Sequence, residues 1–395
     1  MTSQEVALYV HIPYCLAKCP YCDFNSYAAR AWPEEEYARA LIAELAHRAR
    51  EAPFAEATVS TVFFGGGTPS LFTPRTIAHL LSEVRRLLRV AEGAEITLEA
   101  NPGTVDAVRL AGFVEAGVER LSVGVQSFQP ALLEALGRRH TVEDSVRALH
   151  AAREAGFANL SLDLIYAVPG QDLDACAADL ARAVEVAPDH VSAYNLTYEK
   201  GTTMHRDLVA GRIRPAPEEL EVAMYHLVRE RLAAAGYAQY EISNYAQPGR
   251  EARHNLAYWR GLPYLGLGAG AHSFVPRALD TSDAPGASWG ARWENVRDPN
   301  RYMEAVRATG TAVGALDERL TRAQAMGEAC WLGLRERRGL DAAGFAARFG
   351  EPLTRAFPHV AELVDDGLAE WSAADRLRLT PQGLLVADTV FASFL

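Results

Sequence analysis

Long apolar segments are missing from this chain of 395 residues. No stretch approaches the 18 or more uncharged apolar residues that a membrane-spanning helix needs. The amino terminus lacks a basic region followed by an apolar core and a cleavage site, so we expect no signal peptide and a cytoplasmic protein. A surplus of positive charge is also missing, since 50 acidic and 39 basic residues give a net charge of −11. This balance argues against a protein that binds nucleic acid through its phosphates.

Cysteine is scarce, with five residues in the whole chain. An odd number without a secretion signal does not predict a disulfide framework. Cys176 and Cys330 stand alone in helix-like segments, where a cysteine usually serves as a small buried apolar residue. The other three, Cys15, Cys19 and Cys22, fall within eight residues and therefore predict a ligand cluster.

Apolar residues make up 49% of the chain and charged residues 23%, as in ordinary globular proteins. Short β-rich runs alternate with helical segments, a pattern that predicts parallel βαβ units. Six such units form either an open doubly wound sheet or an incomplete barrel. The expected strands are Val6–Ile12, Ser60–Phe64, Glu95–Glu99, Arg120–Val125, Asn159–Ile165 and His190–Leu196; the expected helices between them are Glu34–Arg50, Pro74–Leu88, Asp106–Ala116, Thr141–Ala155 and Leu173–Val186.

Unusual polar or glycine-rich residues follow these strands. The carboxyl ends of parallel strands meet at one edge of a sheet, so these residues should share one site. They are Pro13-Tyr-Cys, Gly65-Gly-Gly-Thr-Pro69, Glu99-Ala-Asn-Pro102, Gln126-Ser and Asp163.

The chain divides into three parts by composition. Residues 1–275 carry the βα pattern. Residues 276–320 begin with a segment, 276–300, that is rich in Pro, Gly, Asp and Ser, and we expect a long loop or linker there. Residues 321–395 show helices followed by a short hairpin and a last helix with Thr380 as N-cap and Pro381 at its first position. This order predicts a small α+β domain of winged-helix type.

Three thiolates spaced C-x3-C-x2-C in a loop after a strand can converge on one metal centre. Three ligands cannot cap all four irons of a [4Fe–4S] cluster, so one iron would stay open to another ligand. The alternative is zinc, which Cys15, Cys19, Cys22 and His11 could bind as a tetrahedron. His11 lies in a strand pattern whose alternation could point its side chain away from the loop.

The segment Tyr9-Val-His-Ile-Pro-Tyr-Cys-Leu-Ala-Lys-Cys-Pro-Tyr-Cys-Asp-Phe-Asn resembles the signature of radical S-adenosylmethionine (SAM) proteins. More narrowly, it is similar to the oxygen-independent coproporphyrinogen III oxidase-like family. The resemblance covers roughly residues 6–275, and the C-terminal part is also similar. It implies a partial (βα)6 barrel, a [4Fe–4S] cluster on the three cysteines, and SAM bound to the fourth iron.

The resemblance also implies a SAM site. Glycines let the backbone approach a ligand that any Cβ would block, and the family uses such a run to hold SAM. Two carboxylates could accept hydrogen bonds from its ribose or amino group, and an arginine could pair with its carboxylate. The implied residues are Tyr9, Gly66, Gly67, Thr68, Glu99, Gln126, Arg138 and Asp163.

A second glycine-rich segment, Gly266-Leu-Gly-Ala-Gly-Ala271, fits the dinucleotide pattern G-x-G-x-x-A. A dinucleotide site needs this pattern between the first strand and helix, whereas here it comes late in the chain. We therefore expect a close-packed turn near the site.

Two departures from the oxidase branch of the family stand out. Phe24 occupies the position where the oxidases carry a further cysteine, and only eight residues precede Tyr9, where the oxidases have a longer extension. The segment Arg253-His-Asn-Leu-Ala-Tyr-Trp259 instead contains H-N-x-x-Y-W, which resembles the motif of the family's heme chaperone branch. His254 could bind heme iron beside the aromatic faces. The alternative is a buried histidine packed among aromatic side chains.

The sequence thus predicts a heme chaperone that binds heme, a [4Fe–4S] cluster and SAM and transfers heme to an acceptor apoprotein. We expect no nucleic-acid partner, and a monomer or a heme-dependent dimer. One alternative is an enzyme, oxygen-independent coproporphyrinogen III oxidase. Another is a transcriptional heme or redox sensor, against which the charge of −11 speaks.

Overall fold

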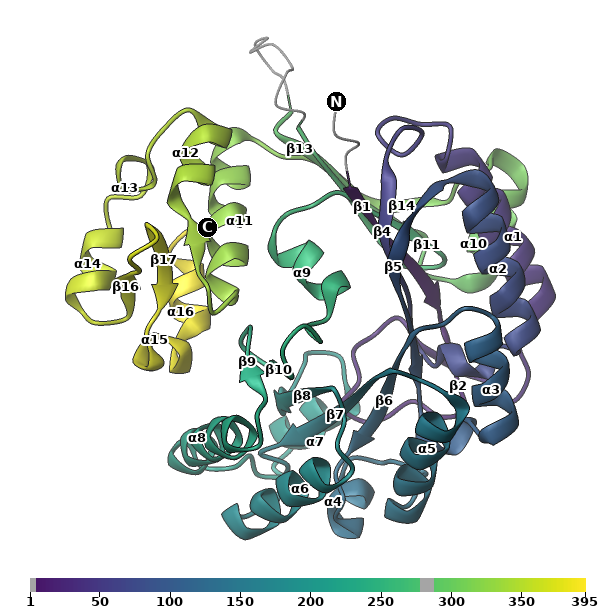
Figure 1. The fold of residues 1–395 in the computed structure, drawn as a ribbon, viewed down its shortest axis with the longest axis horizontal. Helices are drawn as coiled ribbons and strands as arrows, with labels where there is room; N and C mark the ends of the chain where they lie inside the picture. Colours follow the sequence, from purple (N-terminus) through teal and green to yellow (C-terminus); the bar gives the residue numbers. More distant parts are fainter. Residues whose placement is uncertain (1–4, 278–287) are drawn as a thin grey trace.

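Six parallel strands form the centre of the molecule, and helices cover their outer face (Figure 1). The computed structural model describes residues 5–277 and 288–395. This arrangement confirms the expected βα units and the incomplete barrel. In spatial order the strands are β1 (Glu5–Ile12), β4 (Thr58–Gly66), β5 (Arg89–Ala100), β6 (Arg120–Gln126), β7 (Asn159–Tyr166) and β8 (His190–Asn195). The helices that follow them are α1 (Glu34–Arg48), α2 (Pro74–Leu87), α3 (Ala107–Glu115), α5 (Val142–Ala155), α6 (Leu173–Glu185) and α8 (Glu218–Ala234).

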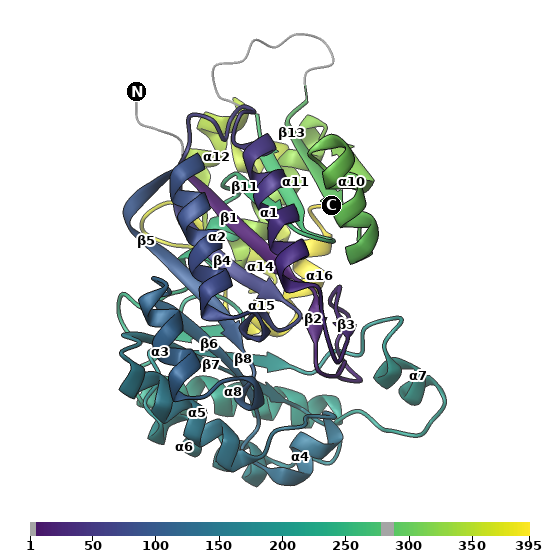
Figure 2. The ribbon, with the colours of Figure 1, turned by 90° about the vertical axis from the view of Figure 1, so that its right-hand side faces the viewer.

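The central strands are apolar because both of their faces are covered. In β6 every residue from Arg120 to Val125 is buried. Strands that pack against helices on one side and barrel side chains on the other gain burial on both faces. The helices pack on the convex side of the sheet, as Figure 2 shows for α1, α2, α3 and α5.

Helix α5 illustrates how the local sequence sets the ends of an element. Thr141 accepts a hydrogen bond from the backbone N–H of Asp144, and the Asp144 carboxylate accepts one from the N–H of Thr141. This capping box satisfies two amide groups that the first turn of a helix leaves without partners. The helix ends at Gly156, whose φ of 102° is accessible to glycine without a Cβ penalty.

The sheet continues beyond the barrel strands on both sides. β11 (Tyr264–Leu267) lies parallel to β1, and the antiparallel strands β12 (His272–Pro276), β13 (Gly290–Asn295) and β14 (Val313–Arg319) follow it. At the other edge, β10 (Asn244–Ala246) and β9 (Ala238–Gln239) pair antiparallel to β8 and to each other. No pairing joins β14 to β9 among the described residues, so the barrel stays open.

The expected linker over residues 276–320 is wrong for the residues described from 288 onward. They form β13, α10 (Pro299–Thr309) and β14. The loop-like composition is densest at residues 278–287, which lie outside the described residues. The tryptophans beside them pack firmly: Trp289 stacks on Phe349 with ring centroids 5.5 Å apart, and Trp293 lies 5.0 Å from the Arg48 guanidinium.

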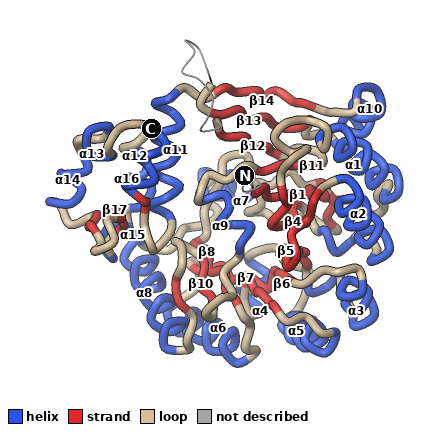
Figure 3. Tube along the Cα trace, turned by 45° about the horizontal axis from the view of Figure 1, so that its top comes forward, coloured by secondary structure: helices blue, strands red, loops and turns tan. Residues whose placement is uncertain are grey.

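The C-terminal residues form a small α+β domain, as expected for the winged-helix type. It occupies the open side of the barrel (yellow-green in Figure 1), and Figure 3 shows its few strands among helices. Its three strands pair antiparallel in the order β15 (Leu340–Asp341), β17 (Arg376–Leu379) and β16 (Ala369–Trp371). Its helices are α11 (Arg322–Arg335), α12 (Ala342–Phe349), α13 (Leu353–Ala356), α14 (Val360–Asp365), α15 (Pro381–Leu385) and α16 (Ala387–Ala392). Within the described ranges, no helix has the length and apolarity to cross a bilayer.

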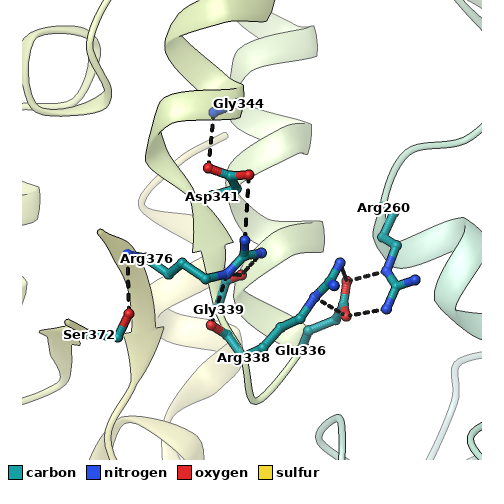
Figure 4. A network of polar contacts seen from close by, with 8 residues as sticks. All are labelled: Arg260, Glu336, Arg338, Gly339, Asp341, Gly344, Ser372 and Arg376. Atoms are coloured by element: carbon teal, nitrogen blue, oxygen red, sulfur yellow. Dashed lines mark hydrogen bonds and ion pairs between the residues drawn. The ribbon is translucent and has the colours of Figure 1, made fainter. Parts of the chain in front are cut away.

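An ion-pair network joins this domain to the barrel (Figure 4). The Glu336 carboxylate, 4% exposed, accepts two hydrogen bonds of 3.1 Å from Arg260, which directly follows α9 (Arg253–Trp259). Arg338 pairs with the same carboxylate at 2.7 Å. A buried carboxylate needs such charged donors to offset its lost hydration. The network therefore fixes the end of α11 against the end of α9.

A second buried carboxylate, Glu44 of α1, ties four elements together. It accepts hydrogen bonds from the Gly268 N–H at 3.0 Å, the Tyr302 hydroxyl at 2.7 Å and the Asn295 amide at 2.7 Å. Burial raises the pKa of Glu44, while these three donors act in the opposite direction. Gly268 has a φ of +100°, and a Cβ there would lie 2.5 Å from the His11 carbonyl oxygen. The second glycine-rich segment is thus a close-packed turn, as the sequence predicts.

We expect Glu44→Ala to lower the free energy of unfolding by about 3 kcal/mol or more, because three buried donors lose their acceptor. Urea denaturation measures the change. Glu36→Ala, an exposed site on the same helix, serves as the control and should change stability by less than about 0.5 kcal/mol. Equal losses in the two variants would contradict the structural role of Glu44.

Candidate functional site

A cavity of about 960 Å³, the central cavity, opens where the parallel strands end. It confirms the expectation that polar residues after the strands share one site. Three cysteines and several residues of the implied SAM site line it. These residues are Cys15, Cys19, Cys22, Gly66, Gly67, Thr68, Glu99, Gln126, Arg138 and Asp163.

The three cysteines come from one loop after β1. The loop begins with β2 (Tyr14–Cys15), which pairs with β3 (Tyr27–Ala28) and so closes the loop at its base. Inside it, the N–H of Cys22 donates to the carbonyl of Cys19 at 3.2 Å, a tight turn. All three side chains are partly exposed and line the central cavity. A loop closed at its base holds three thiols on one side of the cavity.

Hydrogen-bond donors lie beside the sulfur atoms. The Thr68 hydroxyl donates to Cys15 Sγ at 3.5 Å, and the Arg138 guanidinium donates to Cys19 Sγ at 3.4 Å. Cys22 Sγ lies 4.0 Å from the Ser26 hydroxyl. Hydrogen-bond donors beside sulfur stabilise the thiolate form. Burial acts in the opposite direction, since it raises the pKa of Cys15 and so favours the protonated thiol. The loop therefore suits thiolates that a metal centre keeps deprotonated, and this donor set fits an iron–sulfur cluster.

The zinc alternative requires a nitrogen of His11. The Nδ1 atom of His11 shares a hydrogen bond of 3.0 Å with the Tyr9 hydroxyl, and its Nε2 atom one of 2.9 Å with the Asn25 carbonyl. Among the residues described, no three Cys, His, Asp or Glu side chains converge as ligands of a single ion. A cluster with three cysteine ligands places each on a different iron, so its thiolates need not meet at one point.

The glycines after β4 bring the backbone to the cavity wall. Gly66 has a φ of +112°, and a Cβ there would lie 2.5 Å from the His11 ring. A Cβ on Gly67 would lie 2.7 Å from the carbonyl carbon of Pro13. Larger residues would push the turn away from the cysteine loop, so glycine is needed at both positions.

Two carboxyl groups, Glu99 and Asp163, line the central cavity. Burial raises the pKa of Glu99 to about 8, and the nearby Asp163 adds to this rise, while the Gly66 N–H and Arg120 oppose it. Glu99 accepts the Gly66 N–H at 3.2 Å, and Asp163 accepts the Ser122 hydroxyl at 3.3 Å. Before a ligand binds, Glu99 is thus mostly protonated at neutral pH and can become a carboxylate when a cation arrives.

Arg138 connects the cysteine loop to two strand ends. Besides Cys19, its guanidinium donates to the Gly124 carbonyl at 2.9 Å and to the Asn101 side chain. Asn101 in turn donates to the Thr68 hydroxyl at 2.8 Å. This chain orients Thr68 toward Cys15, and the implied pairing of Arg138 with a SAM carboxylate stays a prediction.

Asn101 and Ser122 position residues of the site, although no sequence motif indicates a role for either. Asn101 follows β5 directly and lies in the Glu-Ala-Asn-Pro segment, so its place after a strand could have indicated it. Ser122 lies inside β6, where a serine looks like an ordinary strand residue. The strand positions that face the cavity could have indicated Ser122 once the sheet order was known.

Tyr9 and His254 do not line the central cavity. Tyr9 lines a neighbouring cavity of about 540 Å³, the side cavity. His254 is 1% exposed, and its ring packs on Phe63 with centroids 5.0 Å apart. Its Nδ1 atom shares a hydrogen bond of 2.8 Å with the Thr61 hydroxyl, and its Nε2 atom one of 2.9 Å with the Tyr258 hydroxyl.

His254 therefore has the features of a packed core histidine in this structure. Burial lowers its pKa to about 3, so the ring is neutral, but both of its nitrogens already have partners. Coordination of heme iron would have to break one of these hydrogen bonds and expose the ring. The expected role of His254 as a heme ligand stays a prediction.

Comparisons with known proteins agree with this geometry. Residues 9–182 match the model of the radical SAM superfamily, and residues 320–386 match that of the HemN C-terminal domain. The heme chaperone HemW of Bacillus subtilis is 36% identical over 98% of this chain and 98% of its own length. The heme chaperone HemW of Escherichia coli is 41% identical over 74% of this chain and 78% of its own.

Two further relatives extend the comparison. A mitochondrial radical S-adenosyl methionine domain-containing protein 1 from Bos taurus is 36% identical over 100% of this chain and 88% of its own. Among solved structures, coproporphyrinogen III oxidase HemN of Escherichia coli superposes with a TM-score of 0.82 at 24% identity, covering 99% of this chain and 90% of that one. At this identity the superposition shows a common fold. The chain therefore belongs to the radical SAM superfamily and, within it, to the HemW family of proteins related to HemN.

Proposed function

We propose that this protein is a heme chaperone that holds a [4Fe–4S] cluster and SAM in the central cavity and passes heme to an acceptor protein. The observation that carries the proposal is the meeting of three thiols from one loop with the Gly66–Thr68 turn and two carboxyl groups in one cavity. HemW relatives with 36–41% identity support the chaperone over the oxidase. The cytoplasmic location and the acceptor stay predictions.

Several residues of the central cavity have a defined task in this proposal. Cys15, Cys19 and Cys22 would hold a [4Fe–4S] cluster with one iron open to SAM, and the bound pair would supply a redox centre. The Gly66–Thr68 turn offers backbone groups to the methionine part of SAM, and Glu99 accepts a hydrogen bond from its amino or ribose groups. Arg138 donates to Cys19 and stabilises the thiolate.

Substitution of any one of the three cysteines tests the cluster. We expect Cys15→Ser, Cys19→Ser or Cys22→Ser to reduce iron and acid-labile sulfide after anaerobic reconstitution from about four of each per chain to below about one. The hydroxyl of serine is a poor substitute for a thiolate as an iron ligand. Cys176→Ala is the matched control, since this thiol is buried in α6, and it should keep the full content. Zinc at one per chain without sulfide would refute the cluster.

The pKa of Glu99 predicts a pH dependence of SAM binding. Since Glu99 has a pKa of about 8 and accepts hydrogen bonds as a carboxylate, the affinity for SAM should rise by about tenfold between pH 7 and pH 9. Equilibrium dialysis of the reconstituted protein measures it. Glu99→Gln should flatten this rise, which separates the carboxyl group from groups that titrate on SAM itself. A rise of the same slope in both proteins would contradict the prediction.

Heme transfer tests the function itself. The protein is loaded with heme, separated from free heme and mixed with an apo b-type cytochrome as acceptor. A chaperone hands heme over in a complex, so the transfer rate should increase with acceptor concentration, whereas simple dissociation gives a constant rate. The same preparation is given coproporphyrinogen III under anaerobic, reducing conditions. Turnover of coproporphyrinogen without acceptor-dependent transfer would favour the oxidase.

A further inference from the structure

The side cavity lies beside the central cavity and shares four residues with it: Asp23, Phe24, Gly66 and Glu99. Phe24, the residue that stands where the oxidases carry a further cysteine, is 61% exposed between the two cavities. The volume of about 540 Å³ falls in the usual range for cofactor sites. The side cavity therefore offers a binding place next to the cluster loop.

One wall of the side cavity is the face of three adjacent strands. Tyr264 of β11 pairs with Phe274 of β12, which pairs with Arg292 of β13, and all three side chains line the cavity. Residues two apart on a strand share a face, so His272 points to the same side as Phe274. Its cross-strand neighbour Glu294 lines the cavity as well.

The opposite wall comes from α11 and from the end of α9. Glu328, Trp331 and Leu332 are three and four residues apart on α11 and therefore share one helix face. Tyr258 and Trp259 of α9 close one end. Tyr258 packs edge-on against Tyr264 with ring centroids 4.7 Å apart. Aromatic faces on several sides suit a large, flat and apolar ligand.

Two imidazoles line the side cavity, His11 and His272. Both ring nitrogens of His11 are already bonded, to Tyr9 and to Asn25, and the residue is buried. His272 is half-buried, and its ring bonds to the Gly270 carbonyl, which leaves its second ring nitrogen for a ligand. Burial lowers the pKa of His272, while Glu294 and the Gly270 carbonyl act against this. A neutral imidazole steadied by a carbonyl is the form that binds iron.

Both arginines that line the side cavity form ion pairs with carboxylates of its walls. Arg292 pairs with Glu328, and Arg297 pairs with Glu294. The Arg297 side chain is 68% exposed, so its guanidinium can also reach a carboxylate at the mouth of the cavity. An apolar interior with a cation at the mouth matches a macrocycle that carries carboxylates on one edge.

We propose that heme binds in the side cavity with His272 as the axial ligand of its iron, and that His254 positions the wall instead of binding the iron. This inference rests on the proposed function. His254 holds the Tyr258 hydroxyl at 2.9 Å and so keeps the Tyr258 ring against Tyr264. The three-strand face and α11 would hold the macrocycle beside the Arg292–Glu328 pair, and Phe24 lines both this cavity and the central cavity.

A ligand exchange tests this assignment. In His272→Cys a thiolate replaces the imidazole, so the ferrous–carbonyl complex of bound heme should change from an imidazole-type to a red-shifted thiolate-type Soret band. His254→Cys tests the rival ligand, and His150→Cys, exposed on α5, is the control; both should keep the imidazole-type band. His272→Ala should weaken heme affinity by about tenfold or more, as expected when a ligand shell is disrupted. Circular dichroism confirms that each variant is folded.

The outcomes separate the inference from the function on which it rests. A thiolate-type band in His272→Cys alone supports the assignment. A thiolate-type band in His254→Cys, or unchanged spectrum and affinity in both His272 variants, would overturn it and leave the chaperone function standing. If the unaltered chain binds no heme at a defined stoichiometry, the proposed function itself is wrong.

Discussion

The convergence of parallel strand ends is the constraint on which the rest of this molecule depends. Six strands run in one direction, so the carboxyl ends of β1, β4, β5, β6 and β7 and the segments after them meet at one edge. Side chains from these strand ends and segments line the central cavity. Segments far apart in sequence, such as the cysteine loop and Asp163, become neighbours through this topology alone. The close approach of Gly67 to Pro13 then sets how near the Gly66–Thr68 turn can lie to the thiols. A register slip in β1 would move the cysteine loop away from every partner that stabilises its sulfur atoms.

The sequence predicted the barrel well because its strands and helices carry strong local signals. The apolar runs from Val6 to Ile12 and from Asn159 to Ile165 coincide with β1 and β7 within one residue at their ends. The cysteine motif and the glycine-rich turn are also signals carried by a few consecutive residues. The residues of both motifs line the central cavity. The region after residue 288 was missed because its β13 and α10 follow a segment dense in Pro, Gly and Asp, which dominated the composition of the whole stretch. The average composition of residues 276–320 does not reveal short elements such as β13 and α10. Packing around Trp289 and Trp293 stabilises this region.

The HNxxYW segment shows where local reasoning stops. Residues four apart on a helix share one face, and the side chains of His254 and Tyr258 are in contact. The sequence could not tell which environment that face meets. The fold turns it toward Thr61 and Phe63 of β4, so His254 is buried while Tyr258 reaches the side cavity. His272, by contrast, lies in a short strand without a motif around it, and its place in the cavity depends on pairing with β13. Tertiary pairing, which no local pattern encodes, decides which imidazole a ligand can reach.

Helix α9 also links the side cavity to the C-terminal domain. Trp259 lines the cavity and lies under the Arg335 guanidinium at 4.3 Å, and the next residue, Arg260, pairs with Glu336. Both contacts reach the end of α11, the helix whose Trp331 face forms the opposite wall of the cavity. The width of the side cavity therefore depends on how α11 sits against α9. A cation–π contact and a buried carboxylate hold the two helices together. The C-terminal domain thus supplies one wall of the side cavity, and contacts with the barrel fix the position of that wall.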